Sequence, residues 1–263
     1  MKKFIPILLL IFSFVSAPAF VKTLADRSAD TQIIESNTIK EVEKHIKNPS
    51  ETLIIFDIDN TLAAPEKELG SDEWFNYLVA QKMREGFDAF QALNLQLPKY
   101  FYAQFNVPLI LIEKTSPEFL DYLQKNGVNH MALTARSLYI ADRTTDQLHN
   151  IGIKFSAQKF NDLALNLAHP AILKSGILFS GNNDKGDSLI SFFDTCNYHP
   201  KKVIFIDDKH KNLLSVENAI LNRQIEFVGI RYSGADEKVK NFNPEAAAQQ
   251  LLDLQNYHRN FSK

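Results

Sequence analysis

Apolar runs alternate with amphipathic stretches over most of the chain. The runs that have the composition of buried strands are residues 53–56, 131–133, 177–179, 203–206 and 227–230. Apolar positions at helical spacing separate or follow them, near residues 117–125, 138–150, 185–195 and 244–257. Strands that alternate with helices predict an α/β fold with a doubly wound parallel sheet.

One long segment, residues 64–114, interrupts this alternation. It holds about 50 residues, many of them aromatic at roughly helical spacing. A plain crossover between parallel strands needs far fewer residues, so we expect an inserted, mostly helical cap. Residues 108–112 have the pattern of a strand, so part of this cap segment could form a small sheet. The core domain is then expected in residues 20–63 and 115–263.

The N-terminus has the three parts of a secretory signal peptide. Met1-Lys2-Lys3 is basic, residues 4–15 are almost entirely apolar, and Ala17-Pro18-Ala19 offers a cleavage site. We therefore expect residues 1–19 to be a signal peptide. The protein is then expected to be exported (periplasmic or secreted), with no stable membrane span after cleavage. An uncleaved anchor is the alternative, although the apolar run is short for a bilayer span. Residues 20–36 are expected to form an irregular lead-in, followed by a short helix at 38–47.

Composition narrows the classes of function. Apolar residues make up 45% of the chain and the formal net charge is −2. No basic patch of the kind that binds nucleic acid is visible. Cys196 is the only cysteine, so an internal disulfide is excluded. A cysteine phosphatase would need arginine where Lys202 stands, and we interpret Cys196 as a buried helix residue.

Reactive side chains follow several of the predicted strands. Asp57 and Asp59 follow the first strand, Thr134 ends the second, and Lys185 begins a helix. Asp207-Asp208 follows a later strand. The carboxyl ends of parallel strands share one edge of a sheet, so these side chains are expected to converge. A carboxylate nucleophile, a hydroxyl donor, a cation and an acidic pair are together suited to phosphoryl transfer.

These residues resemble the four motifs of the haloacid dehalogenase (HAD) superfamily, in the family's order. Asp57-Ile58-Asp59-Asn60-Thr61 is similar to the DxDxT motif, Thr134 to the second, Lys185 to the third and Asp207-Asp208 to the fourth. The resemblance covers roughly residues 50–232 and implies a HAD-like, Rossmannoid fold with its first type of cap. Response-regulator receivers are the nearest alternative, but they carry their acidic pair on the first strand.

The resemblance implies a role for each residue. Asp57 would be the nucleophile and Asp59 the general acid and base. Mg²⁺ would be held by the Asp57 carboxylate, the Asp59 backbone carbonyl and Asp207, with Asp208 acting through a water or orienting Lys185. Thr134 and Lys185 would hold the phosphoryl oxygens.

Two further residues are candidates for the substrate site. Arg136 is expected either to contact substrate or to serve in packing or at a helix start. Trp74 is the cap aromatic that we expect to face the ligand, although cap aromatics are more often core residues.

The expected activity is that of an exported, Mg²⁺-dependent phosphatase acting on small phosphate monoesters through an aspartyl-phosphate. A phosphotransferase using the same intermediate remains an alternative. An exported or host-directed binding protein with a vestigial site is another. Oligomeric state is left open by the sequence.

Overall fold

A single eight-stranded sheet forms the centre of the computed structural model, which describes residues 31–155, 160–221 and 223–261. The strand order is β1-β10-β9-β2-β5-β8-β7-β6. In that order the strands are Thr31–Ser36, Glu226–Tyr232, Lys202–Asp207, Thr52–Phe56, Asn129–Thr134, Ile177–Phe179, Ala171–Lys174 and Leu163–Leu165. The first six are parallel, and β7 and β6 are antiparallel additions. The predicted α/β class is confirmed.

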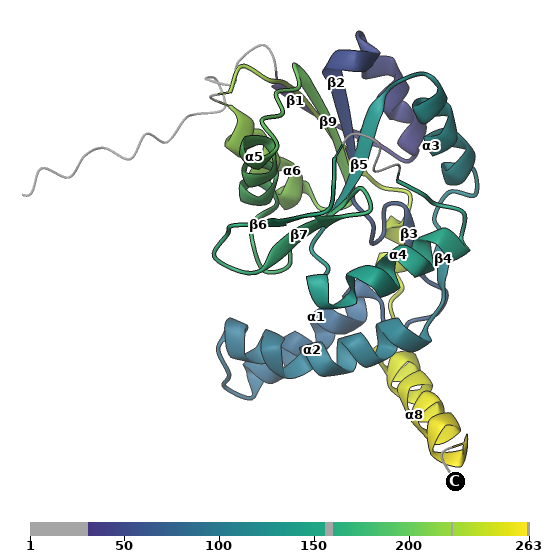
Figure 1. The fold of residues 1–263 in the computed structure, drawn as a ribbon. Coiled ribbons are helices and arrows are strands. Elements are labelled where there is room, and N and C mark those ends of the chain that lie inside the picture. Colours follow the sequence, from purple (N-terminus) through teal and green to yellow (C-terminus); the bar gives the residue numbers. More distant parts are fainter. Residues whose placement is uncertain (1–30, 156–159, 222, 262–263) are drawn as a thin grey trace, which may run out of the picture.

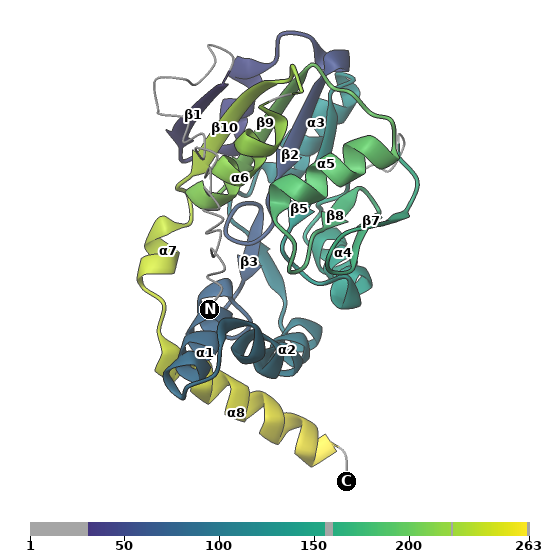
Figure 2. The same ribbon diagram turned by 90° about the vertical axis from the view of Figure 1, so that its left-hand side faces the viewer.

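Helices cover both faces of the sheet (Figure 1 and Figure 2). Strand β2 shows why, because its residues point alternately to the two faces. Ile54 and Phe56 pack with α3 (Ser116–Lys125) and α4 (Ala141–Asn150), whereas Leu53 and Ile55 pack with α5 (Lys185–Thr195) and α6 (His210–Ile220). A strand buried on both faces must be apolar throughout, which is the pattern read from the sequence.

One edge of the sheet differs from expectation. Residues 31–36, expected to be irregular, form β1 and pair in parallel with β10. Ile33 lies opposite Gly229, and a Cβ on that glycine would lie 3.0 Å from the Ile33 side chain. The edge strand β1 therefore fits because Gly229, much later in the sequence, has no side chain. The local hydrophobic pattern of residues 31–36 does not contain this information. Residues 1–19, the expected signal peptide, lie outside the described residues.

Two helices dominate the cap segment, α1 (Asp72–Arg84) and α2 (Ala89–Asn106). A small antiparallel sheet of β3 (Ala63–Pro65) and β4 (Leu109–Leu111) precedes and follows them. Residues 66–71 and 107–108 are therefore the two linkers of the cap segment. The expected strand near residues 108–112 is thus present, and the boundaries of the cap as a separate domain stay a prediction.

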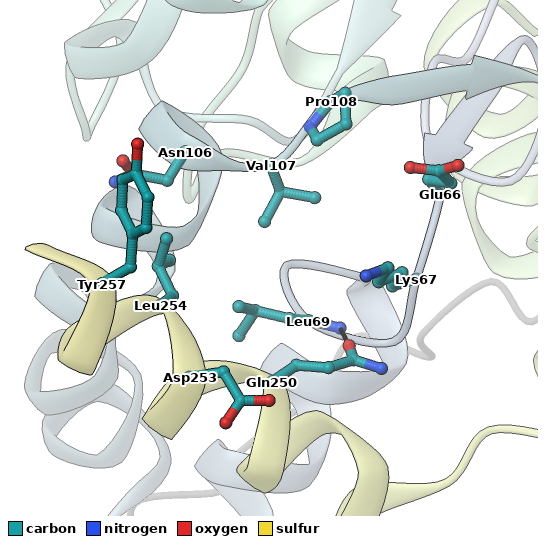
Figure 3. Close-up of a pocket in the computed structure, with 10 residues that line it drawn as sticks. All are labelled: Glu66, Lys67, Leu69, Asn106, Val107, Pro108, Gln250, Asp253, Leu254 and Tyr257. Atoms are coloured by element: carbon teal, nitrogen blue, oxygen red, sulfur yellow. Dashed lines mark hydrogen bonds between the residues drawn. The ribbon is translucent and has the colours of Figure 1, made fainter.

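The C-terminal helix α8 (Pro244–Phe261) packs beside the cap helices and shares their hydrophobic cluster through Ala247 (Figure 2). Figure 3 shows it beside both linkers, around a cavity of about 320 Å³. Leu69 N–H donates to Gln250 Oε1 at 2.9 Å, and His258 Nε2 lies 2.8 Å from Asn106 Oδ1. The cap segment is therefore held by the end of the chain as well as by the core. Within the described residues, no helix combines the length and the apolar content that crossing a bilayer requires.

Helices α5 and α6 approach each other closely at Gly186. A Cβ at this position would lie 2.4 Å from the Ser215 carbonyl oxygen and 2.8 Å from Ala219 Cβ. We expect Gly186→Ala to lower the free energy of unfolding by about 1–3 kcal/mol, since the backbones must separate. Chemical denaturation measures this, with the exposed Asp187→Ala as a control expected to cost about 0.5 kcal/mol. An alanine variant as stable as the wild type would show that the helices are not in close contact.

Candidate active site

The chain turns sharply after β2 and carries Asp57 into a buried position. Asp57 N–H donates to the Ile206 carbonyl at 2.9 Å, which extends the β2–β9 pairing by one residue. The turn then closes through the N–H groups of Leu62 and Ala63, both of which donate to the Ile58 carbonyl at 3.0 Å. Asn60 has a φ of 61°, a left-handed conformation that asparagine tolerates better than most residues. Asp57 is 5% exposed, at the end of the strand as predicted.

Lys185 links two of the predicted motifs directly. It is the first residue of α5, and the preceding Asp184 caps the helix by accepting from Gly186 N–H at 2.8 Å. Lys185 Nζ lies 2.5 Å from Asp57 Oδ1 and 2.7 Å from Asp207 Oδ2. All three side chains are at least nine-tenths buried, so one ammonium group bridges two carboxylates out of contact with bulk water.

The acidic pair at the end of β9 divides into two environments. Asp207 is fully buried and accepts hydrogen bonds from Lys209 N–H at 2.8 Å and from Asn212 Nδ2 at 2.9 and 3.0 Å. Asp208 is half-buried, and its backbone N–H donates to Thr61 Oγ1. Its Oδ1 atom is buried with no hydrogen-bond partner. An unpaired buried oxygen is costly, and a bound cation or hydrogen-bond donor would satisfy it.

Electrostatics at this edge are dominated by buried carboxylates. Burial raises the pKa of Asp57 to about 7, an effect that Lys185 opposes and Asp207 reinforces. Burial and then the Asp57 charge raise the pKa of Asp208 to about 8. Burial alone would lower the pKa of Lys185, but the charges of Asp207 and Asp57 outweigh it and raise that pKa. The carboxylates thus exceed the positive charge available to them, and added cationic charge would stabilise their ionised forms.

The residues present fit a divalent cation. Carboxylate oxygens of Asp57, Asp207 and Asp208 lie within 4.8 Å of one another. Together with the unpartnered Asp208 Oδ1, they offer the hard oxygen donors that Mg²⁺ prefers. The Asp59 carboxylate is not in this group, because it faces Arg136. A metal contact through the Asp59 backbone carbonyl stays a prediction.

Thr134 is at the end of β5, the strand next to β2, with 1% of its surface exposed. Its hydroxyl oxygen accepts from Arg136 N–H at 3.1 Å, and its carbonyl accepts from both Ser180 N–H and Ser180 Oγ at 2.9 Å. Ser180 begins the loop that leads to Lys185. Thr134 is therefore fixed between two motif loops, and its contact with a phosphoryl oxygen stays a prediction.

Arg136 makes a two-pronged ion pair with Asp59. Its Nε and Nη2 atoms donate to the two Asp59 oxygens at 2.8 and 2.7 Å. Nη1 donates to Thr144 Oγ1 at 3.3 Å and to Gln147 Oε1 at 3.0 Å. Burial alone would raise the pKa of Asp59. The charge and hydrogen bonds of Arg136 outweigh this effect, so the pKa of Asp59 lies below its usual value. The guanidinium is thus fully engaged with the protein, and its position does not support direct contact with substrate.

Trp74 is 2% exposed and lies in the hydrophobic cluster of the cap helices. Packing accounts for its side chain, so its position gives no support to a ligand contact.

Two residues at the site were not predicted from the sequence, Asn212 and Lys209. Asn212 donates to Asp207 through its side-chain amide, and Lys209 donates to Asp207 through its backbone N–H. Asn212 lies in the first turn of α6, and an amide placed shortly after an acidic pair is the local signal that could have identified it.

Contacts from the cap segment reach the same edge. Asn60 Nδ2 donates to Glu73 Oε1 at 2.7 Å, and Lys209 pairs with Asp72. Both acidic residues lie in the first turn of α1. The start of α1 is therefore fastened to two loops that carry motif residues.

Comparison with solved structures finds likenesses to hydrolases at low sequence identity. A haloacid dehalogenase-like hydrolase from Streptococcus pneumoniae has a TM-score of 0.41 at 14% identity, over 72% of this chain and 97% of that one. A HAD family hydrolase from Deinococcus radiodurans R1 has a TM-score of 0.41 at 12% identity, over 75% and 100%. These likenesses are distant, and the resemblance rests on the four motifs gathered at one sheet edge.

Sequence relatives come from bacteria. A protein of Chlamydia trachomatis serovar D, provisionally named an outer membrane protein, is 26% identical over 85% of both chains. An uncharacterized protein of Rickettsia prowazekii is 24% identical over 78% of this chain and 77% of that one. The family model described as "Protein of unknown function (DUF2608)" matches residues 35–261. Because that match covers most of this chain, the chain belongs to the DUF2608 family of proteins of unknown function.

Proposed function

We propose that the chain is an exported, Mg²⁺-dependent phosphatase that hydrolyses small phosphate monoesters through an aspartyl-phosphate. The observation that carries this is the buried triad in which Lys185 bridges Asp57 and Asp207, with Asp208 adjacent. A cation and a carboxylate held together out of water favour attack on a phosphoryl group, because that reaction depends on positioning and charge neutralisation.

Each step can be assigned to a residue. An Asp57 oxygen attacks phosphorus, and the bond from phosphorus to the leaving oxygen breaks as Asp59 gives that oxygen a proton. A water then loses its proton to Asp59 and attacks phosphorus, which releases inorganic phosphate and restores Asp57. The ion pair with Arg136 favours the ionised carboxylate, which is the form of Asp59 that this second step needs. The same ion pair opposes the protonated form, so the first step uses the proton that Asp59 gains from water in the preceding cycle.

Lys185 and Thr134 serve the transferred group. Lys185 Nζ is within hydrogen-bond distance of the nucleophile, so it can neutralise a phosphoryl oxygen beside Asp57 as a point charge. Mg²⁺ bound by Asp57, Asp207 and Asp208 would supply further neutralisation of the phosphoryl oxygens. The contacts of α1 with two motif loops bring the start of that helix to this edge, which supports a small phosphorylated substrate. The net charge of −2 gives no support to nucleic acid as a partner.

Two observations support export. The sequence pattern of residues 1–19 is that of a signal peptide. Relatives in Chlamydia carry names that refer to the outer membrane. A periplasmic or secreted location follows for this chain as part of the proposal.

The nucleophile is tested by Asp57→Asn. We expect turnover of phosphate esters to fall about 1,000-fold or more, equivalent to about 4 kcal/mol of barrier, because an amide cannot form the acyl phosphate. Steady-state assays over a panel of phosphate esters measure this, with circular dichroism to verify folding. Asp187→Asn, at an exposed position on α5, is the matched control and should retain full activity. An Asp57→Asn protein within tenfold of wild type would refute the assignment.

Metal binding is tested by thermal unfolding with and without Mg²⁺. Mg²⁺ at about 100 times its dissociation constant should add about 2.7 kcal/mol of stability and raise the Tm by several degrees. Asp208→Asn should reduce that shift strongly, whereas Asp187→Asn should leave it unchanged. EDTA should abolish activity and Mg²⁺ should restore it. Full activity in the EDTA-treated protein would contradict a metal-dependent reaction.

A further inference from the structure

A buried polar network runs from Asp59 to the linkers of the cap segment. Arg136, Thr144, Gln147 and Gln104 are each 3% exposed or less, yet every one is polar. Buried polar side chains are retained only where their hydrogen bonds are satisfied, so their partners show what the network connects.

The first link is the guanidinium of Arg136. Its Nε and Nη2 atoms hold both oxygens of Asp59, and Nη1 faces Thr144 and Gln147. The planar fork of arginine fixes both the distance and the plane of the carboxylate that it binds. Asp59 therefore cannot rotate independently of Arg136.

Gln147, on α4, is the second link and has only one workable orientation. Its Oε1 accepts from Arg136, and its Nε2 donates to the carbonyls of Gln104 and Val107, each at 3.0 Å. Reversing the amide would turn a donor toward the guanidinium and an acceptor toward two carbonyl oxygens. This single side chain therefore contacts both the partner of Asp59 and the second linker.

The third link joins the two linkers. Gln104 Nε2 donates to the Gly70 carbonyl at 2.7 Å, and Glu66 N–H donates to the Pro108 carbonyl at 3.3 Å. These hydrogen bonds connect linker residues 66–71 to α2 and to residues 107–108. Arg143 also donates to the carbonyls of Gln104 and Val107. It is not among the hydrogen-bond partners of Arg136, so it does not link the linker to Asp59.

We propose that Arg136 is a positioning residue for Asp59 and that Gln147 makes this positioning depend on where the cap linkers lie. Displacing the second linker together with the end of α2 removes the Val107 and Gln104 carbonyls as acceptors of Gln147 Nε2. The amide then no longer holds the guanidinium, and Asp59 gains freedom. The catalytic consequence rests on the proposed function, in which Asp59 transfers protons. The network then ensures that the proton carrier is aligned when the cap segment is seated.

The mechanical part is tested without any activity. Hydrogen–deuterium exchange of the full chain is followed in peptides that cover residues 66–71 and 104–109, which include the hydrogen-bonded amides of Glu66, Leu69 and Val107. Asp59→Asn and Gln147→Met should each speed exchange there, and the double variant should be no faster than Gln147→Met alone. Thr145→Val, on the same helix, is the matched control: it loses a hydrogen bond within α4, to the Ala141 carbonyl, and should exchange like wild type. If Asp59→Asn exchanges like wild type while Gln147→Met is faster, the coupling is refuted.

A second substitution guards against simple misfolding. Gln147→Glu keeps an oxygen for Arg136 but loses the donor to the linker carbonyls, so it should also speed exchange at the linkers. Unchanged exchange in both Gln147 variants would refute the link between Gln147 and the cap segment.

The catalytic part is tested by the first turnover with two esters. An alkyl phosphate needs its leaving oxygen protonated, whereas 4-nitrophenyl phosphate has a leaving group that departs as the anion. General acid catalysis contributes about 100-fold or more, so Asp59→Asn should lose about that factor with the alkyl ester. Gln147→Met should lose about tenfold with the alkyl ester and less than about threefold with the aryl ester. Equal losses with both esters would show a merely structural role.

The two proposals fail in different ways. If the wild type hydrolyses neither ester but the exchange results hold, the proposed function is wrong and the coupling stands. If the wild type is active but Asp59→Asn leaves the linkers unchanged, the coupling is wrong and the proposed function stands.

Discussion

Charge packed at the carboxyl edge of a buried sheet is the constraint on which the structure depends. Asp57 directly follows β2 and Asp207 is the last residue of β9. Both strands are buried throughout, so both carboxylates are held away from bulk water. Ionised groups in such a place must be paired or bind a cation. Lys185 supplies one positive charge from the start of α5, and Asp208 retains a buried oxygen without a partner. The local architecture, from the Asp184 cap to the close approach at Gly186, serves to hold that lysine between its two carboxylates.

The same constraint explains how the cap segment is attached. Polar groups around the edge find partners in the cap: Asn60 with Glu73, Lys209 with Asp72, and Arg136 through Gln147 with the second linker. Hydrophobic packing of Trp74 gives the cap helices their own core. Hydrophobic packing therefore stabilises the cap helices, and the polar contacts fix their position relative to the sheet edge.

The central strands and the strand-end residues were predictable because each signal is local. An apolar run followed by acidic residues, as at Asp57, specifies strand, turn and chemistry within about ten positions. Edge strand β1 was not predicted because its position in the sheet depends on Gly229. The antiparallel strands β6 and β7 were not predicted because their apolar runs are short. Arg136 could be placed near the site but its engagement with Asp59 could not, because that choice depends on Gln147 eleven residues away. Such tertiary pairings have no periodicity.

The position of α8 sets an order of events in the maturation of the chain. Gln250 receives the N–H of Leu69 from 181 residues earlier, which is the most distant of the side-chain contacts that hold the linkers. Chains are made from the N-terminus. The core strands and the motif residues through Asp208 can therefore emerge before the helix that supports the cap. Closing so long a loop comes late in folding. The last segment to arrive thus completes the cover over the acidic edge, and a chain cut short before residue 244 would carry every motif residue beneath an incompletely supported cap.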